Sequence, residues 1–297
     1  MQPALSRRLG IHARVHQVAV MDRGAKRSAH SDLFGTRELA RETHCAVIVA
    51  HPDDEVIGAG GLISRLNNVT VLHITDGVPG NGYVAEAGYS TCSDYAQARR
   101  RECQKALALA KVDPEHVIEF GLGSQQMPLK LADLTRRVAG FLKHTSPDVV
   151  LTHPYEGGHP DHDATAFATH AALRLLRRNG FKTPSVFEIA LHPSRDGKKR
   201  VLDFLAGGAS EITTLLLDEK ARDLKQQMFA CFTTQPDLQR EAFSRERFRK
   251  PPRYDFAAPP MGGLQNYENF GTVNDSDWQA LVREAWSSLF PTEAKPH

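Results

Sequence analysis

Short apolar runs that alternate with helical patterns constrain this chain more than any other feature of its sequence. Continuous segments rich in β-branched residues stop at turn residues, which predicts buried strands over residues 45–50, 69–74, 117–120, 148–152 and 185–191. Apolar residues recur at helical spacing between and after them, which predicts helices over residues 56–66, 94–111, 131–143, 162–178, 218–232 and 277–289. This alternation predicts an α/β fold with a mostly parallel sheet and helices on both faces.

The alternating pattern occupies the middle of the 297-residue chain and divides it into three stretches. Residues 1–43 have poor apolar periodicity and a surplus of lysine and arginine, so we expect an N-terminal extension that is poorly ordered. Residues 44–297 carry all the predicted strands and are expected to form one domain. From about residue 205 the alternation weakens and prolines accumulate, which predicts a loop-rich C-terminal elaboration near the functional site.

Charge, hydropathy and cysteine content exclude several classes of function. The formal net charge of +2 is too small to indicate nucleic acid or a membrane surface as the main partner. No apolar run approaches the roughly 20 residues that span a bilayer, and residues 1–30 lack the apolar core of a secretory signal. The four cysteines form no CxxC pair, as expected of a reduced, cytoplasmic protein. The sequence leaves the oligomeric state open.

A cluster of polar residues, Ala50-His51-Pro52-Asp53-Asp54-Glu55, follows directly after the first predicted strand. Burying several unpaired charges on such a turn would be costly. Adjacent carboxylates also repel each other unless a cation lies near them. A bound divalent metal ion would remove both costs.

A second cluster, His159-Pro160-Asp161-His162-Asp163, follows the predicted strand 148–152 across a short loop that contains two glycines. Because the carboxyl ends of parallel strands share one edge of the sheet, the two clusters are expected to meet there. Imidazole and carboxylate ligands with one position left for water are typical of catalytic zinc, although Fe(II), Co and Mn occupy similar sites. The cysteines lie outside both clusters, which argues against a structural zinc site.

Together the two clusters resemble the motifs of the PIG-L/LmbE-like N-acetylglucosaminyl deacetylase family. The resemblance extends from about Cys45 into the C-terminal third of the chain, and both motifs are complete. It implies a Rossmann-like α/β fold and a zinc-dependent hydrolase, in which a metal-activated water removes an N-acyl group, above all N-acetyl, from an amino sugar or sugar conjugate. The implied cofactor is Zn²⁺, and the implied partner is a small N-acyl amino-sugar substrate.

The resemblance also implies a role for individual residues. Zinc would be bound by His51, Asp54 and His162. Asp53 would act as the general base toward the attacking water. His159 would be protonated and would stabilise the oxyanion or protonate the leaving amine, while Asp161 would orient a neighbouring histidine.

Several further residues are candidates for the site or for the core. Arg99, in the run Arg99-Arg100-Arg101, resembles a family arginine that helps to bind substrate, but a solvated helix face explains it equally well. Which of the three arginines points inward stays open. Asp76 ends a strand at the same sheet edge and either binds substrate hydroxyls or caps a turn. His73 lies within a strand and is interpreted as a core histidine. The C-terminal segments Tyr254-Asp255-Phe256 and Asn266-Tyr267-Glu268 are suited to stacking on a sugar.

Two alternative functions remain open. The same chemistry could act on a non-sugar acyl amine, or a non-catalytic Rossmann-like module could bind a sugar or nucleotide and keep the metal for structure. The glycines of Gly58-Ala59-Gly60-Gly61 lack the GxGxxG spacing of a nucleotide site and instead predict close packing of a helix on the sheet. A binding module has no need of a base beside a metal ligand, so Asp53 favours the enzyme.

Overall fold

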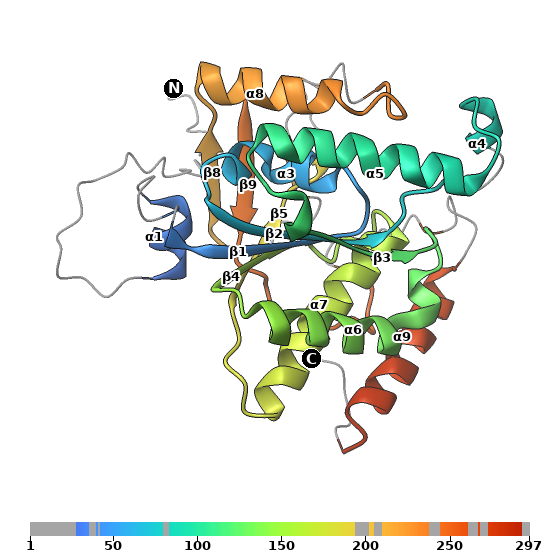
Figure 1. Ribbon diagram of the computed structural model, residues 1–297. Coiled ribbons are helices and arrows are strands. Elements are labelled where there is room, and N and C mark those ends of the chain that lie inside the picture. Colours follow the sequence, from blue (N-terminus) through green and yellow to red (C-terminus); the bar gives the residue numbers. More distant parts are fainter. Residues whose placement is uncertain are drawn as a thin grey trace, which may run out of the picture.

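A seven-stranded sheet forms the centre of the molecule, in the strand order β3-β2-β1-β4-β5-β9-β8 (Figure 1). Five strands are parallel: β1 (His44–Val49), β2 (Asn68–Thr75), β3 (Val117–Leu122), β4 (Val149–Thr152) and β5 (Ser185–Ile189). Two strands run antiparallel to their neighbours: β8 (Ile212–Leu216) and β9 (Arg245–Arg249). The computed structural model describes residues 28–35, 40, 42–79, 83–193, 202–204, 210–237, 244–260, 267 and 273–292.

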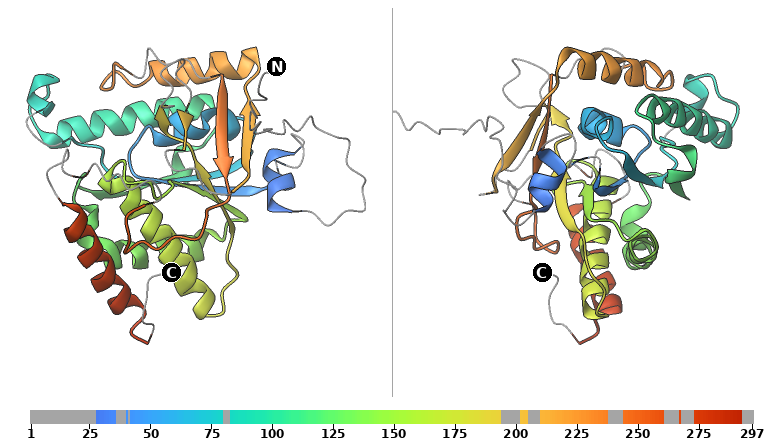
Figure 2. Two further views of the ribbon diagram at one scale, coloured as in Figure 1. Left: turned by 180° about the vertical axis from the view of Figure 1, so that it is seen from behind. Right: turned by 60° about the vertical axis from the view of Figure 1, so that its left-hand side comes forward.

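Helices cover both faces of this sheet (Figures 1 and 2). One face carries α3 (Asp54–Ile63), α5 (Cys92–Leu109) and α8 (Glu219–Ala230). The other carries α6 (Leu131–Thr145), α7 (Pro160–Arg178) and α9 (Asp275–Leu289). The shorter elements are α1 (Ala29–Phe34), α4 (Tyr83–Glu86), η1 (Pro114–His116), η2 (Met127–Lys130), β6 (His192–Pro193) and β7 (Leu202–Asp203). The predicted α/β fold with a mostly parallel, doubly covered sheet is confirmed.

The continuous apolar composition of β1 follows from its position between two helix layers. Successive side chains of a strand point to opposite faces. Cys45, Val47 and Val49 therefore pack into the core beneath α3, α5 and α8. Ala46 and Ile48 pack into the second core, beneath α6, α7 and α9. A strand buried in this way has no face left for polar residues.

The C-terminal stretch departs from the prediction of a loop-rich elaboration. β8 and β9 extend the central sheet, and β9 pairs with β5. The sequence of β9, Arg-Glu-Arg-Phe-Arg, gave no strand signal because its charges find partners only in the folded molecule. Arg249 Nε donates to Glu188 Oε2 (2.7 Å), and Arg247 forms an ion pair with Asp203.

The structure also differs from the prediction within the N-terminal extension and at the start of one helix. Within the predicted loose extension, residues 29–34 form the helix α1, whose Leu33 is 1% exposed, while residues 1–27 lie outside the described residues. α5 begins at Cys92, and its N-cap is Thr91. The helix thus starts two residues before the predicted position 94, and the backbone N–H of Asp94 donates to the Thr91 hydroxyl (3.1 Å).

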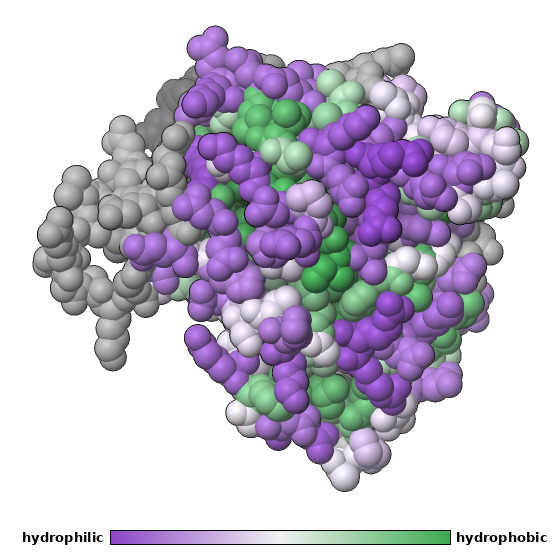
Figure 3. Space-filling view, in the orientation of Figure 1, coloured by the Kyte–Doolittle hydropathy of each residue, from purple (hydrophilic) through white to green (hydrophobic). Residues whose placement is uncertain are grey.

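Polar side chains dominate the face of the molecule that Figure 3 draws, with apolar atoms confined to smaller areas. The most exposed large apolar side chains of the described residues are Leu216 on β8 and Leu129 on η2, which belong to separate elements. No helix within the described ranges combines the length and hydropathy needed to cross a membrane.

A buried ion pair joins the C-terminal elements to α3. Lys225 Nζ on α8 lies 2.6 Å from Glu246 Oε1 on β9 and donates to the carbonyl oxygen of Ile57 (2.8 Å). The Glu246 carboxylate accepts hydrogen bonds from the backbone N–H groups of Gly61 (2.6 Å) and Leu62 (2.9 Å). The ion pair therefore forms hydrogen bonds with two N–H groups and one carbonyl oxygen of the α3 backbone.

Glycine at position 61 is required for this close approach. A Cβ atom there would lie 2.5 Å from Leu217 Cδ2 and 3.1 Å from Glu246 Oε1. At Gly58 it would lie 3.0 Å from side-chain atoms of Ile189 and Leu191. The glycines of α3 thus serve helix–sheet packing, as their spacing predicts.

We expect Lys225→Met to lower the free energy of unfolding by about 3–5 kcal/mol, because it leaves the buried Glu246 carboxylate without its counter-charge. Denaturant unfolding followed by circular dichroism measures the change. Lys182→Met is the matched control, since Lys182 is 88% exposed and 3.8 Å from Asp148; its expected effect is below about 1 kcal/mol. Equal losses in the two variants would contradict this account of the ion pair.

Candidate metal centre and active site

The two polar clusters meet at the carboxyl ends of β1 and β4, which are adjacent parallel strands. Chain connections lead from β1 toward β2 and β3 on one side, whereas β4 and β5 lie on the other. The strand order therefore reverses between β1 and β4, and ligands bind at such a switch point in open α/β sheets. The first cluster lies between β1 and α3, and the second leads into α7.

Three side-chain atoms form a near-equilateral triangle at this point. His51 Nδ1 lies 3.4 Å from Asp54 Oδ2 and 3.2 Å from His162 Nε2, and the latter two atoms are 3.5 Å apart. Ligands about 2.1 Å from a tetrahedral metal ion lie about 3.4 Å from one another. The triangle therefore fits a divalent cation bound by two imidazoles and one carboxylate.

The charges of the triangle also suit a cation. Burial alone would raise the pKa of Asp54, but the neighbouring His162 and His153 imidazoles hold it well below its ordinary value. Burial alone would lower the pKa of His51, yet hydrogen bonds with Asp161 and Asp54 raise it to about 10. In the metal-free chain these shifts favour a protonated His51 beside an ionised Asp54, and a bound metal ion would have to displace that proton.

Asp161 fixes the orientation of His51. Its Oδ2 lies 3.2 Å from His51 Nε2, so Nδ1 is the nitrogen that faces the triangle. The same oxygen accepts from the backbone N–H of Gln125 (2.6 Å) and the hydroxyl of Ser124 (3.0 Å). A carboxylate behind a metal-binding histidine is a common supporting arrangement. Ser124 and Gln125 were not predicted, because they lie in a loop after β3 that has no motif of its own.

His159 is the N-cap of α7. Its Nδ1 accepts a hydrogen bond from the backbone N–H of Asp161 (3.1 Å), and its ring centroid lies 4.7 Å from that of His51. Burial and then the proximity of His51 lower the pKa of His159 to about 3. The resemblance implies a protonated His159, whereas this environment makes the imidazole neutral with its hydrogen on Nε2.

Asp53 has a backbone conformation that L-residues rarely adopt, with φ 151° and ψ −27°. Such conformations cost on the order of 1–3 kcal/mol and persist where the surroundings hold them in place. The side chain is buried, and its Oδ2 accepts from Arg99 Nη2 (3.0 Å). Burial raises the pKa of Asp53 to about 7, although Arg99 acts in the opposite direction.

Of the three arginines, it is Arg99 that points inward. It is 4% exposed, and besides Asp53 it donates to the carbonyl oxygens of Pro52 (2.7 Å) and Gly77 (3.2 Å). Arg100 pairs with Glu119 near the surface, with a side chain that is 55% exposed. The inward guanidinium thus binds the turn that carries Asp53.

His153 is a further member of the site that sequence reasoning missed. It is fully buried, its ring stacks on His162 with centroids 4.0 Å apart, and its Nε2 lies 3.4 Å from Asp54 Oδ2. The same Nε2 accepts a hydrogen bond from the backbone N–H of Ala50 (2.8 Å), which links the two loops. A signal existed: His153-Pro154 follows β4 directly, as His51-Pro52 follows β1.

The remaining predicted residues have other contacts. Asp76 Oδ1 accepts from the backbone N–H of Val78 (3.0 Å), which is the turn-capping alternative. Tyr254, Phe256 and Tyr267 are at most 7% exposed and belong to the core beneath α6 and α7, so the prediction that they stack on a sugar is wrong. Asn266 and Glu268 lie outside the described residues.

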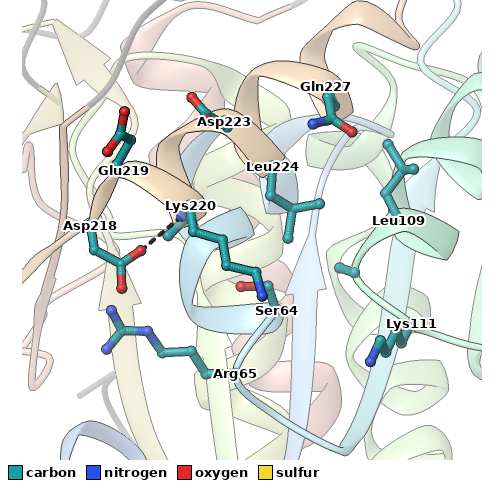
Figure 4. A pocket seen from close by; sticks show the side chains of 12 residues that line it. Ser64, Arg65, Leu109, Lys111, Asp218, Glu219, Lys220, Asp223, Leu224 and Gln227 are labelled. Carbon is teal, nitrogen blue, oxygen red and sulfur yellow. Dashed lines mark hydrogen bonds between the residues drawn. The ribbon is translucent and has the colours of Figure 1, made fainter.

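A hollow of about 640 Å³ lies elsewhere, between the C-terminal ends of α3 and α5 and the beginning of α8 (Figure 4). Ser64, Arg65, Lys111 and Asp218 are among its lining residues. These segments precede β2 and β3, so the hollow is at the amino ends of the strands, opposite to the histidines. Its location gives it no part in the chemistry of the two motifs.

Comparison with known proteins agrees with the motifs. Residues 46–173, which include both clusters, match the model of the family described as PIG-L: GlcNAc-PI de-N-acetylase. The diacetylchitobiose deacetylase of Thermococcus kodakarensis is 30% identical over 128 residues, which cover 40% of this chain and 45% of that protein. The 1D-myo-inositol 2-acetamido-2-deoxy-alpha-D-glucopyranoside deacetylase of Kineococcus radiotolerans is 25% identical over 222 residues, which cover 61% of this chain and 62% of that protein. The matches thus span less than two thirds of either relative.

Solved structures share the fold at lower sequence identity. A zinc-inhibited form of a teicoplanin deacetylase superposes with a TM-score of 0.53 at 17% identity, over 70% of this chain and 97% of that one. A 4-carboxy-2-hydroxymuconate hydratase from Pseudomonas putida superposes with a TM-score of 0.54 at 18% identity, over 71% of this chain and 98% of that one. Because a deacetylase and a hydratase share this fold, the side chains of the site must decide the reaction.

Proposed function

The chain carries a PIG-L-family segment over residues 46–173, and from this premise we propose that it is a zinc-dependent hydrolase that removes an N-acetyl group from an amino sugar or sugar conjugate. The observation that carries the proposal is the triangle of His51 Nδ1, Asp54 Oδ2 and His162 Nε2, with sides of 3.2–3.5 Å. Two nitrogens and one oxygen in this spacing suit Zn²⁺ with a fourth position open, and Fe(II), Co and Mn accept the same donors.

Such an ion, when bound, lowers the pKa of water to about 7 and polarises a carbonyl group. The protein residues supply the remaining requirements of amide hydrolysis. Asp53 adjoins the ligand Asp54 and is buried, so its carboxylate can accept a proton from the attacking water within the site. Arg99 holds that carboxylate through Oδ2, which fixes the direction in which the other oxygen points.

His159 is suited to the oxygen or nitrogen of the substrate amide. Its Nδ1 is occupied by the N–H of Asp161, so Nε2 carries the hydrogen and can donate it. A donor aimed at a developing oxyanion contributes roughly 3 kcal/mol to the transition state in other hydrolases. Asp161 contributes indirectly, because its carboxylate orients His51.

The amino-sugar substrate is proposed from the relatives, whose names include diacetylchitobiose and an acetamido-deoxyglucopyranoside. We expect acetate release from N-acetylglucosamine conjugates to exceed that from acetylated amino acids by at least about tenfold in kcat/KM. A site that binds substrate hydroxyls rejects substrates that lack them, which is the reason for this margin. Acetate is measured in a coupled assay with the zinc-loaded protein. Faster release from acetylated amino acids would select the alternative of a non-sugar acyl amine.

A further inference from the structure

A second buried cluster lies beneath the turn that carries Asp53. It comprises Glu55 on α3, His73 on β2 and Cys103 on α5, and these residues are 0%, 0% and 1% exposed. Glu55 Oε2 lies 2.9 Å from His73 Nε2, and Glu55 Oε1 accepts from the Cys103 thiol at 3.3 Å. The cluster brings three separate elements of the fold to one carboxylate.

The same carboxylate reaches the backbone of the catalytic turn. Glu55 Oε2 accepts a hydrogen bond from the N–H of Asp53 (3.1 Å). Asp53 is the residue with the rarely adopted φ of 151°, and its carbonyl oxygen accepts from the N–H groups of Val56 (3.0 Å) and Ile57 (2.9 Å). Only residues that bind the turn from more than one side can maintain such a conformation. Arg99 binds the turn through the carbonyl oxygen of Pro52, and Glu55 binds it through the N–H of Asp53.

We propose that Glu55, His73 and Cys103 form a positioning cluster that holds the Asp53 backbone and so fixes where the Asp53 carboxylate lies beside the ligand Asp54. The inference rests on the proposed function in assigning Asp53 as the base. None of the three residues need touch substrate. Cys103 and His73 act through Glu55, because each occupies one of its oxygens and keeps the carboxylate from turning away from the Asp53 N–H.

A metal ion is the competing occupant of this cluster, since a thiol, an imidazole and a carboxylate are all metal ligands. The hydrogen bonds favour the positioning role. Both Glu55 oxygens already accept from donors, and closed zinc sites use four protein ligands, whereas three ligand side chains gather here among the described residues. A thiolate bound to cobalt gives a charge-transfer band, so the two occupants are distinguishable by spectroscopy.

The test compares Cys103→Ala with Cys103→Ser and Cys45→Ala in the full chain loaded with zinc. Cys45 is a fully buried cysteine on β1 that packs in the same core as Cys103 but lies outside the cluster, so it controls for the loss of volume. We expect Cys103→Ala to lower kcat about tenfold, as for other residues that support an active site indirectly, with KM and zinc content unchanged. Cys103→Ser should recover most of kcat, because its hydroxyl also donates, and Cys45→Ala should keep it.

Equal kcat values for Cys103→Ala and Cys45→Ala would overturn the proposal and leave the cluster as packing only. A thiolate-to-cobalt band in the cobalt-loaded protein that disappears in Cys103→Ser would overturn it in favour of a metal site. Amide hydrogen exchange separates this inference from the proposed function. Faster exchange of the Asp53 N–H in Cys103→Ala than in Cys45→Ala supports positioning even if no acetylated substrate is hydrolysed, and equal exchange refutes it.

Discussion

Asp53→Asn is expected to reduce kcat/KM by a factor of about 10²–10⁴, the range that general acid–base catalysis contributes, while the protein keeps its zinc. Asparagine has nearly the same shape as aspartate but cannot accept a proton. The three atoms of the metal triangle belong to other residues, so their spacing of 3.2–3.5 Å is not altered directly. Acetate release gives the rate, and elemental analysis gives the zinc content of the same sample.

The control for this experiment is Asp133→Asn. Asp133 lies on α6 with a side chain that is 83% exposed, and its only role in the described structure is a surface ion pair with Arg136. Its turnover should equal that of the wild type. Full activity in Asp53→Asn would exclude Asp53 as the base. Zinc binding without any hydrolysis in the wild type would instead favour the non-catalytic binding module.

The pH dependence of kcat/KM is a second test of Asp53 as the base. A base must be ionised to accept a proton, so kcat/KM should decrease as the pH falls through the pKa of Asp53. Burial raises that pKa to about 7 in the metal-free chain, and a neighbouring dication would lower it. The acid limb of the wild-type profile is therefore expected below pH 7. An identical acid limb in the residual activity of Asp53→Asn would assign the limb to another group.

Removal of the metal is expected to abolish turnover and to destabilise the fold. Chelation should lower acetate release to background, and stoichiometric Zn²⁺ should restore it. Binding that is specific to the folded state stabilises it by about 4 kcal/mol when free metal is a thousandfold above Kd. The metal-free protein should consequently unfold at lower temperature, which calorimetry measures in parallel with activity.

Single substitutions then locate the ligands. His162→Ala and Asp54→Ala should each lose zinc and activity together, because each removes one corner of the triangle. His153→Gln should retain zinc, since its Nε2 is already the acceptor for the Ala50 N–H. The opposite pattern, with zinc lost in His153→Gln and kept in His162→Ala, would move the centre to Asp54 and His153.

The sequence alone was sufficient for the five parallel strands and for the two motifs at their carboxyl ends. Strands buried on both faces are continuous apolar runs, as in β1, so their signal is local and survives without knowledge of the neighbours. The placement of His51 and His162 at one sheet edge followed from the same topology, because adjacent parallel strands end together.

Only the tertiary structure decided which polar residues lie inside. By sequence, β9 is a charged segment and Lys225 a surface residue. In the folded molecule Arg249 forms a buried ion pair with Glu188, and Lys225 is buried against Glu246 and the backbone of α3. The burial of His153, Glu55 and Cys103 likewise depends on partners that are distant along the chain. Local periodicity of apolar residues predicts which of them are buried. A charge or polar group is stable in the core only when a partner binds it there, and that partner is distant along the chain, so a local sequence pattern does not identify it.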